Sequence, residues 1–233
     1  MGRLSVEILA HTPTPERAVA VAARLCYSPR SVSELAEALT DAEVEKLVGK
    51  ITSMGHFSTL EHAVFTFGID GISRACSHQL VRHRVASYSQ QSQRYVELKK
   101  VEAVIPPSIS KSKKSRALFE KKLEEIWKLY GELVEGGVPA EDARYILPNA
   151  CETKIVVTMN ARELHHFFAL RLCTRAQWEI REMAKEMYRA AYAVSPLLFS
   201  GAGPGCVRGK CTEGEYCCGQ QKKVRAELKK LLA

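Results

Sequence analysis

The sequence predicts an α+β fold in which one small sheet is covered by helices. Segments with the helical spacing of apolar residues outnumber strand-like segments, which are few and far apart along the chain. Neither Gly-x-Gly-x-x-Gly nor a Walker lysine loop is present, so a Rossmann or P-loop arrangement is not expected. The chain shows no internal repeat and no persuasive domain boundary before residue 200.

The first half of the chain is expected to begin with a strand and to continue mainly as helices. Thr14 is the expected cap of a first helix, with Pro15 at its first position. Thr40 and Glu43 form a capping box for a second helix, which Gly55 ends. A polar connection or short helix follows. The expected segments are strands over residues 6–10 and 63–69, helices over 14–26, 40–54 and 72–83, and the connection over 56–62.

The second half is expected to contain one further strand between long helices. Paired glycines and prolines mark the limits of several elements. Glu141 and Arg144 have the spacing of an ion pair within one short helix. The core candidates of the helix over 160–172 are Leu164, Phe167, Phe168 and Leu170. The expected segments are an extended stretch over 94–105, helices over 110–135, 139–148, 160–172 and 175–193, and a strand over 154–159.

Length and charge narrow the possible classes of protein. The 233 residues are 46% hydrophobic, which fits one sizeable domain or two small ones with enough apolar residues for a core. A net charge of +8 favours anionic partners such as nucleotides, phosphates or nucleic acid. Nucleic acid is the less expected of these, because the lysines over residues 111–122 lack interleaved aromatic residues except Phe119. No apolar run approaches 20 residues and the N-terminus lacks a signal-peptide pattern, so we expect a cytoplasmic protein without a membrane span.

Residues 79–95 form a basic and polar segment that predicts an anion site. Arg82, His83 and Arg84 are consecutive, and Ser92 and Arg94 follow closely. Guanidinium groups suit two-pronged contact with phosphate, and hydroxyl and backbone N–H groups complete such a site. The alternative is a solvated polar loop. The segment lies between two apolar runs rather than at an end of the chain, which favours a site for a phosphorylated small molecule.

Four of the eight cysteines are clustered near the C-terminus among glycines, at Cys206, Cys211, Cys217 and Cys218. A structural zinc site needs four ligands in tetrahedral arrangement, and this spacing lacks a Cys-x2-Cys pair. Reduced thiols in an ordered tail and a disulfide such as Cys206–Cys211 are the alternatives. We expect no metal. The other four cysteines, Cys26, Cys76, Cys151 and Cys173, are expected to be reduced and mostly buried.

Three blocks of sequence together resemble the flavin-dependent thymidylate synthases. The first is Arg82-His83-Arg84, a gap of seven residues, and Ser92-Gln93-Arg94-Tyr95. The second runs from Gly55-His56 to Glu61-His62, and the third from Asn160-Ala161-Arg162 through Arg171 to Ala176-Gln177-Trp178-Glu179. A weaker fourth block runs from Pro139 to Pro148 and contains Arg144. The blocks occur in the order found in that family.

The resemblance implies a single catalytic domain over residues 1–200, with a Gly/Cys-rich extension and short basic helix over 201–233. It implies a small, curved, mostly antiparallel sheet covered by long helices, the fold of thymidylate synthase-complementing proteins. It also implies a homotetramer with active sites at subunit interfaces. FAD would be the bound cofactor, NADPH its reductant and methylenetetrahydrofolate the carbon donor. The acceptor dUMP would become dTMP, and tetrahydrofolate would be released.

The resemblance also implies roles for individual residues. Arg171 matches the arginine that polarises the uracil near N3, and His56 matches a histidine of the folate and flavin region. The residues that match dUMP contacts are Gln79, Leu80, Val81, Arg82, Gln90, Gln91, Ser92, Gln93, Arg94, Arg144 and Arg171. Those that match flavin contacts are Ser58, Arg82, His83, Arg84, Gln90, Asn160, Arg162 and His166. Gln90 stands where Glu is frequent in the family, and His166 where Asn is frequent.

The chemistry of the residues agrees with these roles. Methylation at C5 of uracil requires a nucleophilic C5, which hydride addition at C6 from reduced flavin would provide. A fixed cation such as Arg171 would stabilise the charge that develops over the ring carbonyls and N3. Ser92 is interpreted as a phosphate or loop ligand rather than a nucleophile, because the sequence places no base and orienting group beside it. A catalytically impaired flavin-binding or nucleotide-binding homologue is the alternative.

Overall fold

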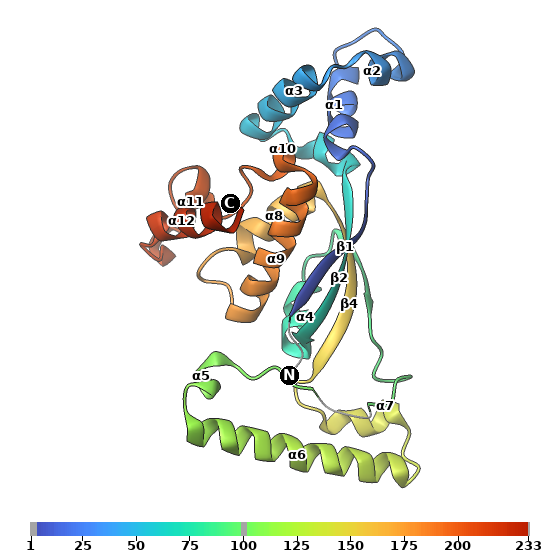
Figure 1. Ribbon diagram of the computed structural model, residues 1–233, viewed down its shortest axis with the longest axis vertical. Coiled ribbons are helices and arrows are strands. Elements are labelled where there is room, and N and C mark those ends of the chain that lie inside the picture. Colours follow the sequence, from blue (N-terminus) through green and yellow to red (C-terminus); the bar gives the residue numbers. More distant parts are fainter. Residues whose placement is uncertain (1–3, 99–101, 233) are drawn as a thin grey trace. The chain divides into compact units, whose positions relative to one another are not determined.

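The computed structural model describes residues 4–98 and 102–232 (Figure 1). Its sheet is small and antiparallel, with strand order β1-β2-β4-β3, so the predicted α+β class is confirmed. Residues 1–3 of the expected N-terminal segment and 99–101 of the expected extended stretch lie outside the described residues. The strands are β1 (Ser5–His11), β2 (Val64–Ser73), β3 (Ala86–Gln90) and β4 (Glu152–Asn160).

The chain divides into two compact units. Unit 1 comprises the described residues of Met1–Ser5, Ile69–Arg82 and Ser89–Ile155, and unit 2 comprises Val6–Gly68, His83–Tyr88 and the described residues of Val156–Ala233. All four strands contribute residues to both units. The proposed limits of a catalytic domain over 1–200 and an extension over 201–233 therefore stay a prediction.

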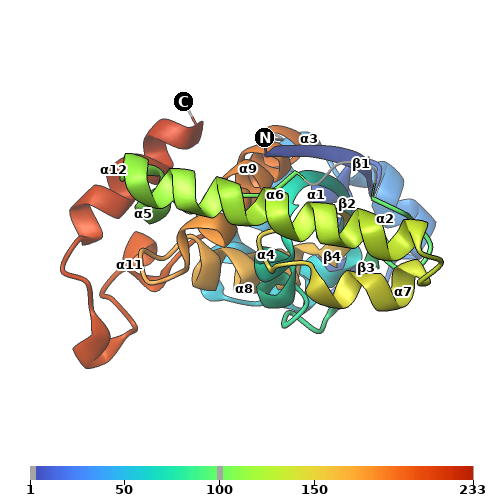
Figure 2. The same ribbon diagram turned by 90° about the horizontal axis from the view of Figure 1, so that it is seen from below.

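Unit 1 contains one long helix with shorter helices around it. Helix α6 contacts α5, α7 and the 3-10 turn η2 (Figure 2). The helices of this unit are α4 (Arg74–Leu80), α5 (Pro107–Ser110), α6 (Lys113–Glu135), α7 (Ala140–Ala143) and η2 (Arg144–Ile146). The predicted long helix over 110–135 is α6, which begins at Lys113 rather than at residue 110 because Ser112 caps it by accepting the N–H of Ser115.

Unit 2 contains the aromatic core. Phe168 lies 5.1 Å from Tyr188 between ring centroids, and Phe65 lies 5.3 Å from Phe199. Helix α8 packs against α9 and η1. The elements of this unit besides the strands are α1 (Pro15–Leu25), α2 (Val32–Ala38), α3 (Asp41–Met54), η1 (Phe57–His62), α8 (Ala161–Arg171), α9 (Trp178–Val194), α10 (Pro196–Phe199), α11 (Gly205–Arg208), η3 (Gly214–Tyr216) and α12 (Gln221–Leu232).

One carboxylate joins the two ends of unit 2 in the sequence. Glu16 Oε1 accepts a hydrogen bond from Ser195 Oγ at 2.9 Å and another from the backbone N–H of Leu197 at 2.9 Å. Glu16 lies in the first turn of α1, and Ser195 and Leu197 lie at the start of α10. This carboxylate therefore fixes α1 to a segment about 180 residues away along the chain.

Several expectations for the elements were wrong. Thr14 precedes α1 but makes no side-chain capping bond, because its backbone is left-handed with φ of 42°. Helix α2, whose capping box is formed by Ser31 and Glu34, was not predicted. Strand β2 continues to Ser73, so α4 begins at Arg74 rather than at residue 72. Leu170 is 46% exposed rather than buried.

The basic and polar segment also differs from its expected structure. Residues 86–90 form strand β3, although the sequence there has too few apolar residues to indicate a strand. Helix α4 ends at Leu80, so Arg82, His83 and Arg84 follow the helix rather than ending it. No helix within residues 4–98 and 102–232 is long and apolar enough to cross a membrane.

Candidate active site

Helix α8 carries most of the titratable groups of the site in unit 2. Asn160 caps the helix, since its Oδ1 accepts the backbone N–H of Glu163 at 2.9 Å. Glu163 and His166 lie one turn apart on the helix, and Arg171 is its last residue. The cap fixes the first turn of α8 and so the place of Glu163.

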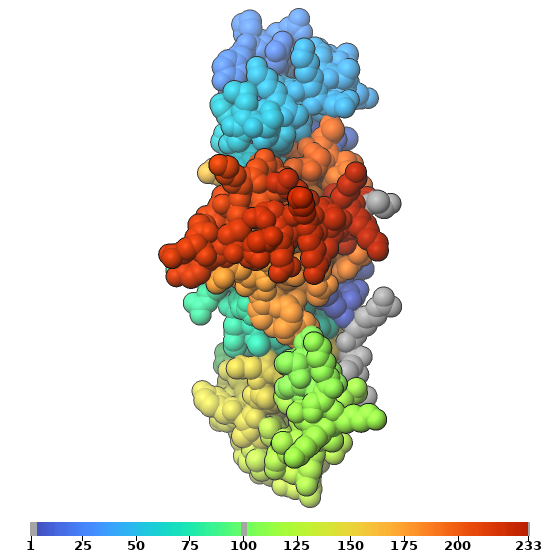
Figure 3. All heavy atoms as spheres, turned by 90° about the vertical axis from the view of Figure 1, so that its left-hand side faces the viewer, coloured from blue at the N-terminus to red at the C-terminus, as the bar shows by residue number. Residues whose placement is uncertain are grey.

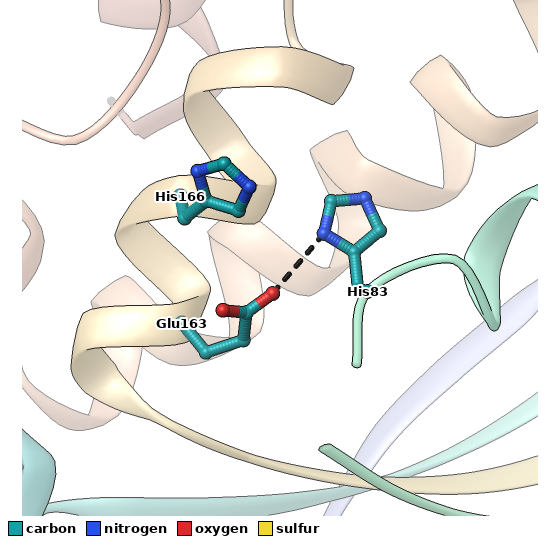
Figure 4. Close-up of side chains that lie close together, drawn as sticks. All are labelled: His83, Glu163 and His166. Atoms are coloured by element: carbon teal, nitrogen blue, oxygen red, sulfur yellow. Dashed lines mark hydrogen bonds and ion pairs between the residues drawn. The ribbon is translucent and has the colours of Figure 1, made fainter. Parts of the chain in front are cut away.

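A chain of hydrogen bonds connects Glu163, His83 and Arg171 (Figure 4 shows the first two residues with His166). His83 Nδ1 lies 3.1 Å from Glu163 Oε1, and the Nε–H of Arg171 donates to His83 Nε2 at 3.1 Å. A guanidinium can only donate, so Nε2 must accept. The proton of the neutral ring is therefore on Nδ1 and is donated to the carboxylate of Glu163.

Burial keeps His83 neutral. The side chain is 4% exposed, and Phe167 packs edge-on against its ring with centroids 4.9 Å apart. Burial, the charge of Arg171 and His166 together lower the pKa of His83 to about 4. Burial raises the pKa of Glu163, while His166 acts in the opposite direction. The hydroxyl of Tyr88 donates to the backbone carbonyl of His83 at 2.8 Å and fixes the loop.

The side chains of His83, Glu163 and His166 offer three ligand atoms within 4.8 Å of one another. Both ring nitrogens of His83 are already engaged, one by Glu163 and one by Arg171. A guanidinium at hydrogen-bond distance from His83 also repels a cation. This cluster is therefore a hydrogen-bonded array that orients Arg171, rather than a metal site.

The other residues of unit 2 predicted to contact flavin are mostly exposed. Arg84 and His166 face solvent, and Arg162 forms an ion pair with Glu61 at the surface. His56 and Ser58 line a separate cavity of about 380 Å³ beside α1 and α3. Asn160 has a structural role as the cap of α8, in addition to its predicted contact with the cofactor.

In unit 1, Gln90 ties β3 to its neighbours. Its side-chain amide donates to Ser77 Oγ at 2.9 Å and to Thr153 Oγ1 at 3.2 Å. Ser77 in turn donates to the carbonyl of Arg74. Next to this strand the hydroxyl of Ser92 accepts the backbone N–H of Arg94 at 3.1 Å and so closes a turn.

Three arginines and one glutamate surround the end of α7. Glu141 accepts from Arg94 Nε at 2.7 Å through its carboxylate and from Arg144 Nε at 3.1 Å through its backbone carbonyl. The expected side-chain pair between Glu141 and Arg144 is therefore replaced by a pair with Arg94. Burial and the charge of Arg144 lower the pKa of Arg74. Neighbouring like charges attract an anion.

The remaining predicted nucleotide contacts in unit 1 differ in exposure. Arg82 and Val81 are exposed, and Gln79 is half-buried. Leu80 is fully buried. Gln91 and Gln93 are half-buried, and Gln91 lines a cavity of about 190 Å³ with Thr153.

Sequence reasoning did not identify Glu163 and Arg74. Glu163 lies in the first turn of the expected helix over 160–172, and no pattern indicates that His83, 80 residues earlier, reaches it. The one available signal was Arg171 beside an apolar stripe, since a buried cation needs a partner. Arg74 follows a strand directly, and its proximity to Arg144 depends on the tertiary fold.

Comparison with known proteins identifies the family. The family profile described as thymidylate synthase complementing protein matches residues 7–197. A flavin-dependent thymidylate synthase of Geobacter sulfurreducens is 56% identical over 224 residues, covering 95% of this chain and 97% of the relative. Proteins with the same name from Clostridium tetani and Pyrococcus furiosus are 47% and 45% identical, each over at least 96% of both chains. The chain therefore belongs to the thymidylate synthase complementing protein family, whose matching relatives are named flavin-dependent thymidylate synthases.

Proposed function

We propose that this protein is a flavin-dependent thymidylate synthase that converts dUMP to dTMP. Methylenetetrahydrofolate donates the carbon, NADPH supplies the reducing equivalents through FAD, and tetrahydrofolate is released. Relatives that match nearly the whole chain bear this name. The observation that carries the proposal is Arg171, whose guanidinium is oriented by a buried neutral histidine at the end of α8.

The donor groups of unit 2 suit a flavin dinucleotide. Exposed Arg84, Arg162 and His166 offer N–H donors for an anionic pyrophosphate and for the edge of a flavin ring. When bound, the flavin supplies the hydride that adds to C6 of uracil. The residues proposed to hold it are Ser58, Arg82, His83, Arg84, Gln90, Asn160, Arg162 and His166, with His56 in the folate and flavin region.

Arg171 is the proposed catalytic residue. Its Nε–H donates to Nε2 of His83, which fixes the plane and direction of the guanidinium. A guanidinium keeps its proton at all physiological pH values, so it stabilises negative charge near N3 without transferring a proton. Glu163 holds the proton of His83 on Nδ1, and His83 thereby remains an acceptor for Arg171.

The arginines of unit 1 are proposed to bind the phosphate of dUMP. Arg94 and Arg144 share Glu141, and Arg74 lies near Arg144. Ser92 holds the turn that contains Arg94, which supports a role as loop or phosphate ligand. Gln79, Leu80, Val81, Arg82, Gln90, Gln91 and Gln93 complete the proposed dUMP contacts.

The proposal includes a homotetramer in which residues 90–94 of one chain reach dUMP bound largely by another chain. It also includes a cytoplasmic location. Because active sites at subunit interfaces need more than one chain, a strictly monomeric preparation should be inactive.

The test is purification followed by a coupled assay. We expect a yellow protein that binds FAD, oxidises NADPH faster when dUMP is added, and forms dTMP from dUMP and methylenetetrahydrofolate. A colourless protein that does not bind added FAD would overturn the proposal. A protein that binds FAD and dUMP but forms no dTMP would instead be a catalytically impaired homologue.

A further inference from the structure

Four cysteines from distant parts of the sequence line one small cavity in unit 2. The cavity has a volume of about 20 Å³, close to the space of a single water or ion. Cys173 reaches it from the connection between α8 and α9, and the other three come from the C-terminal segment. The cysteines that line it are Cys173, Cys206, Cys211 and Cys218. Sequence spacing alone did not indicate Cys173 as a member of the group.

The turn that follows Cys218 directs a backbone N–H to its sulfur. Gly219 has φ of 69°, a left-handed conformation that glycine adopts without strain. The turn directs the N–H of Gln220 to Cys218 Sγ at 3.4 Å. The hydroxyl of Thr174, this N–H and the charge of Arg175 lower the pKa of the Cys218 thiol. A thiolate is the form of cysteine that binds metal.

The interior of the cavity also contains a buried hydroxyl group. Thr174 lines the cavity, and its Oγ1 is buried. Burial raises the pKa of Cys206, and the neighbouring thiols of Cys173 and Cys218 raise it further. Thiolates that repel one another in this way are stabilised together by a cation.

Two arginines surround the cluster with positive charge. Arg225 of α12 donates to the carbonyl of Cys206 at 2.6 Å and to that of Gly209 at 2.7 Å, and so fixes the loop that carries Cys206. Arg175 donates to the carbonyl of Tyr216 at 3.4 Å, next to Cys217. The net charge of four thiolates with one divalent ion is negative, and nearby guanidiniums offset it.

We propose that Cys173, Cys206, Cys211 and Cys218 bind one zinc ion, which fastens the C-terminal segment to the start of α9. Tetrahedral coordination by four thiolates is the usual structural zinc site, and binding releases the four thiol protons. In the described part of the structure, no three of these four sulfurs lie within 4.8 Å of one another. Binding therefore draws the loop over residues 206–218 inward, which Gly209 and Gly214 allow.

Cys217 provides a matched control. It is adjacent to Cys218 but does not line the cavity, and its sulfur accepts the side-chain amide of Gln221 at 3.0 Å. It also lies near Cys211, so a Cys211–Cys217 disulfide is the competing arrangement. Figure 3 shows the C-terminal segment, in red, on the surface, where both solvent ions and oxidants reach it.

The experiment measures zinc in the full chain purified without added metal. We expect about one zinc per chain in the wild type and in Cys217→Ser, and roughly tenfold less in Cys218→Ser and Cys206→Ser. If a serine variant does not fold, the wild-type chain stripped of metal and loaded with Co²⁺ gives the answer. Four thiolates produce intense thiolate-to-cobalt absorption and tetrahedral d–d bands.

Three outcomes would overturn the proposal. The first is a wild-type chain that contains no zinc and takes up neither Zn²⁺ nor Co²⁺. The second is a disulfide among these cysteines in the freshly purified protein, seen as a mass two daltons lower per bond by mass spectrometry. The third is equal loss of zinc in Cys217→Ser and Cys218→Ser. None of these outcomes depends on whether the protein makes dTMP.

Discussion

At the scale of single residues, the array of Glu163, His83 and Arg171 is defined by which atom carries each proton. Arg171 donates to Nε2 of His83, and this fixes the remaining proton on Nδ1. The carboxylate of Glu163 then accepts a hydrogen bond from this N–H, which offsets the free-energy cost of burying the carboxylate. Each member therefore determines the protonation or orientation of the next.

Replacement of Arg171 tests the proposed catalytic role. Arg171→Lys keeps the charge but loses the planar fork that reaches His83 and a ligand at once. We expect kcat for dTMP formation to fall about 10² to 10³-fold, with FAD absorbance retained. Arg189→Lys, which changes an exposed arginine paired with Glu186, is the control and should leave kcat unchanged. Unaltered kcat in Arg171→Lys would contradict the role.

The lowered pKa of His83 predicts a pH-dependent stability. Between the ordinary histidine pKa of about 6.5 and the folded value of about 4, the unfolded chain binds a proton that folded His83 does not bind. Stability from this group is therefore complete above pH 6.5 and is lost as the pH falls toward 4. The raised pKa of Glu163 acts in the opposite direction.

Urea unfolding at a series of pH values measures this dependence. His83→Gln should show a flatter loss of stability between pH 6.5 and 4 than the wild type, since one titrating group is removed. His62→Gln, a change of an exposed histidine, should keep the wild-type slope. Equal slopes in all three proteins would show that His83 is not held neutral.

The structure explains why residue 90 is a glutamine rather than a glutamate. Ser77 donates its only hydroxyl proton to the carbonyl of Arg74, so its oxygen needs a donor, which the amide of Gln90 supplies. Gln90→Glu would place a carboxylate against that oxygen. We expect a loss of about 1 to 2 kcal/mol of stability, measured by urea unfolding and relieved at acid pH. Gln93→Glu is the control on the same segment, and an equal loss there would contradict this explanation.

At the scale of elements, the sequence predicted best where local chemistry decides the structure. The capping box of Thr40 and Glu43, the apolar spacing of α3 and the left-handed Gly55 all lie within one segment, and the structure confirms them. Helix α2 has a similar box at Ser31 and Glu34 but is only seven residues long, so its apolar pattern is too short to recognise.

Strand β3 shows why other elements could not be predicted from the sequence. Its residues are Ala-Ser-Tyr-Ser-Gln, which are too polar to indicate a strand. The segment is a strand because β4 lies beside it in the sheet and because Gln90 reaches two hydroxyls of other segments. These contacts are tertiary, and no local pattern reveals them.

The two threonines before α1 and α3 form a matched pair for measurement. Thr40 accepts the N–H of Glu43 at 3.3 Å, whereas Thr14 makes no capping bond with its side chain. We expect Thr40→Ala to lower the free energy of unfolding by about 1 kcal/mol, and Thr14→Ala to change it by less than about 0.5 kcal/mol. Thermal or urea unfolding distinguishes the two, and similar losses would contradict the assigned caps.

At the scale of the whole molecule, the resemblance in sequence identified the family, and physical reasoning alone identified only an anion site. The consecutive Arg82, His83 and Arg84 illustrate the difference. In the sequence they form one basic group. In the structure Arg82 belongs to unit 1, whereas His83 belongs to unit 2 and is a buried neutral ring. Burial and protonation depend on the complete fold.

Mixing two inactive variants tests whether active sites combine residues of different chains. Arg94→Ala should remove a phosphate contact of unit 1, and Arg171→Lys should remove the catalytic guanidinium of unit 2. If a site takes residues 90–94 from one chain and Arg171 from another, co-refolded or co-expressed mixtures regain dTMP formation above either variant alone. Mixing after separate assembly is the control. No recovery in co-expressed tetramers would indicate that each chain builds its own site.

The carboxylate of Glu16 has a consequence for biosynthesis. A ribosome releases α1 early, but the groups that satisfy Glu16, Ser195 and Leu197, emerge only when about four-fifths of the 233 residues have been made. Contacts between such distant residues form late and slowly. Until then α1 can pack against α2, α3 and η1, which follow it directly in the sequence, while the carboxylate of Glu16 lacks the two donors that it has in the complete fold.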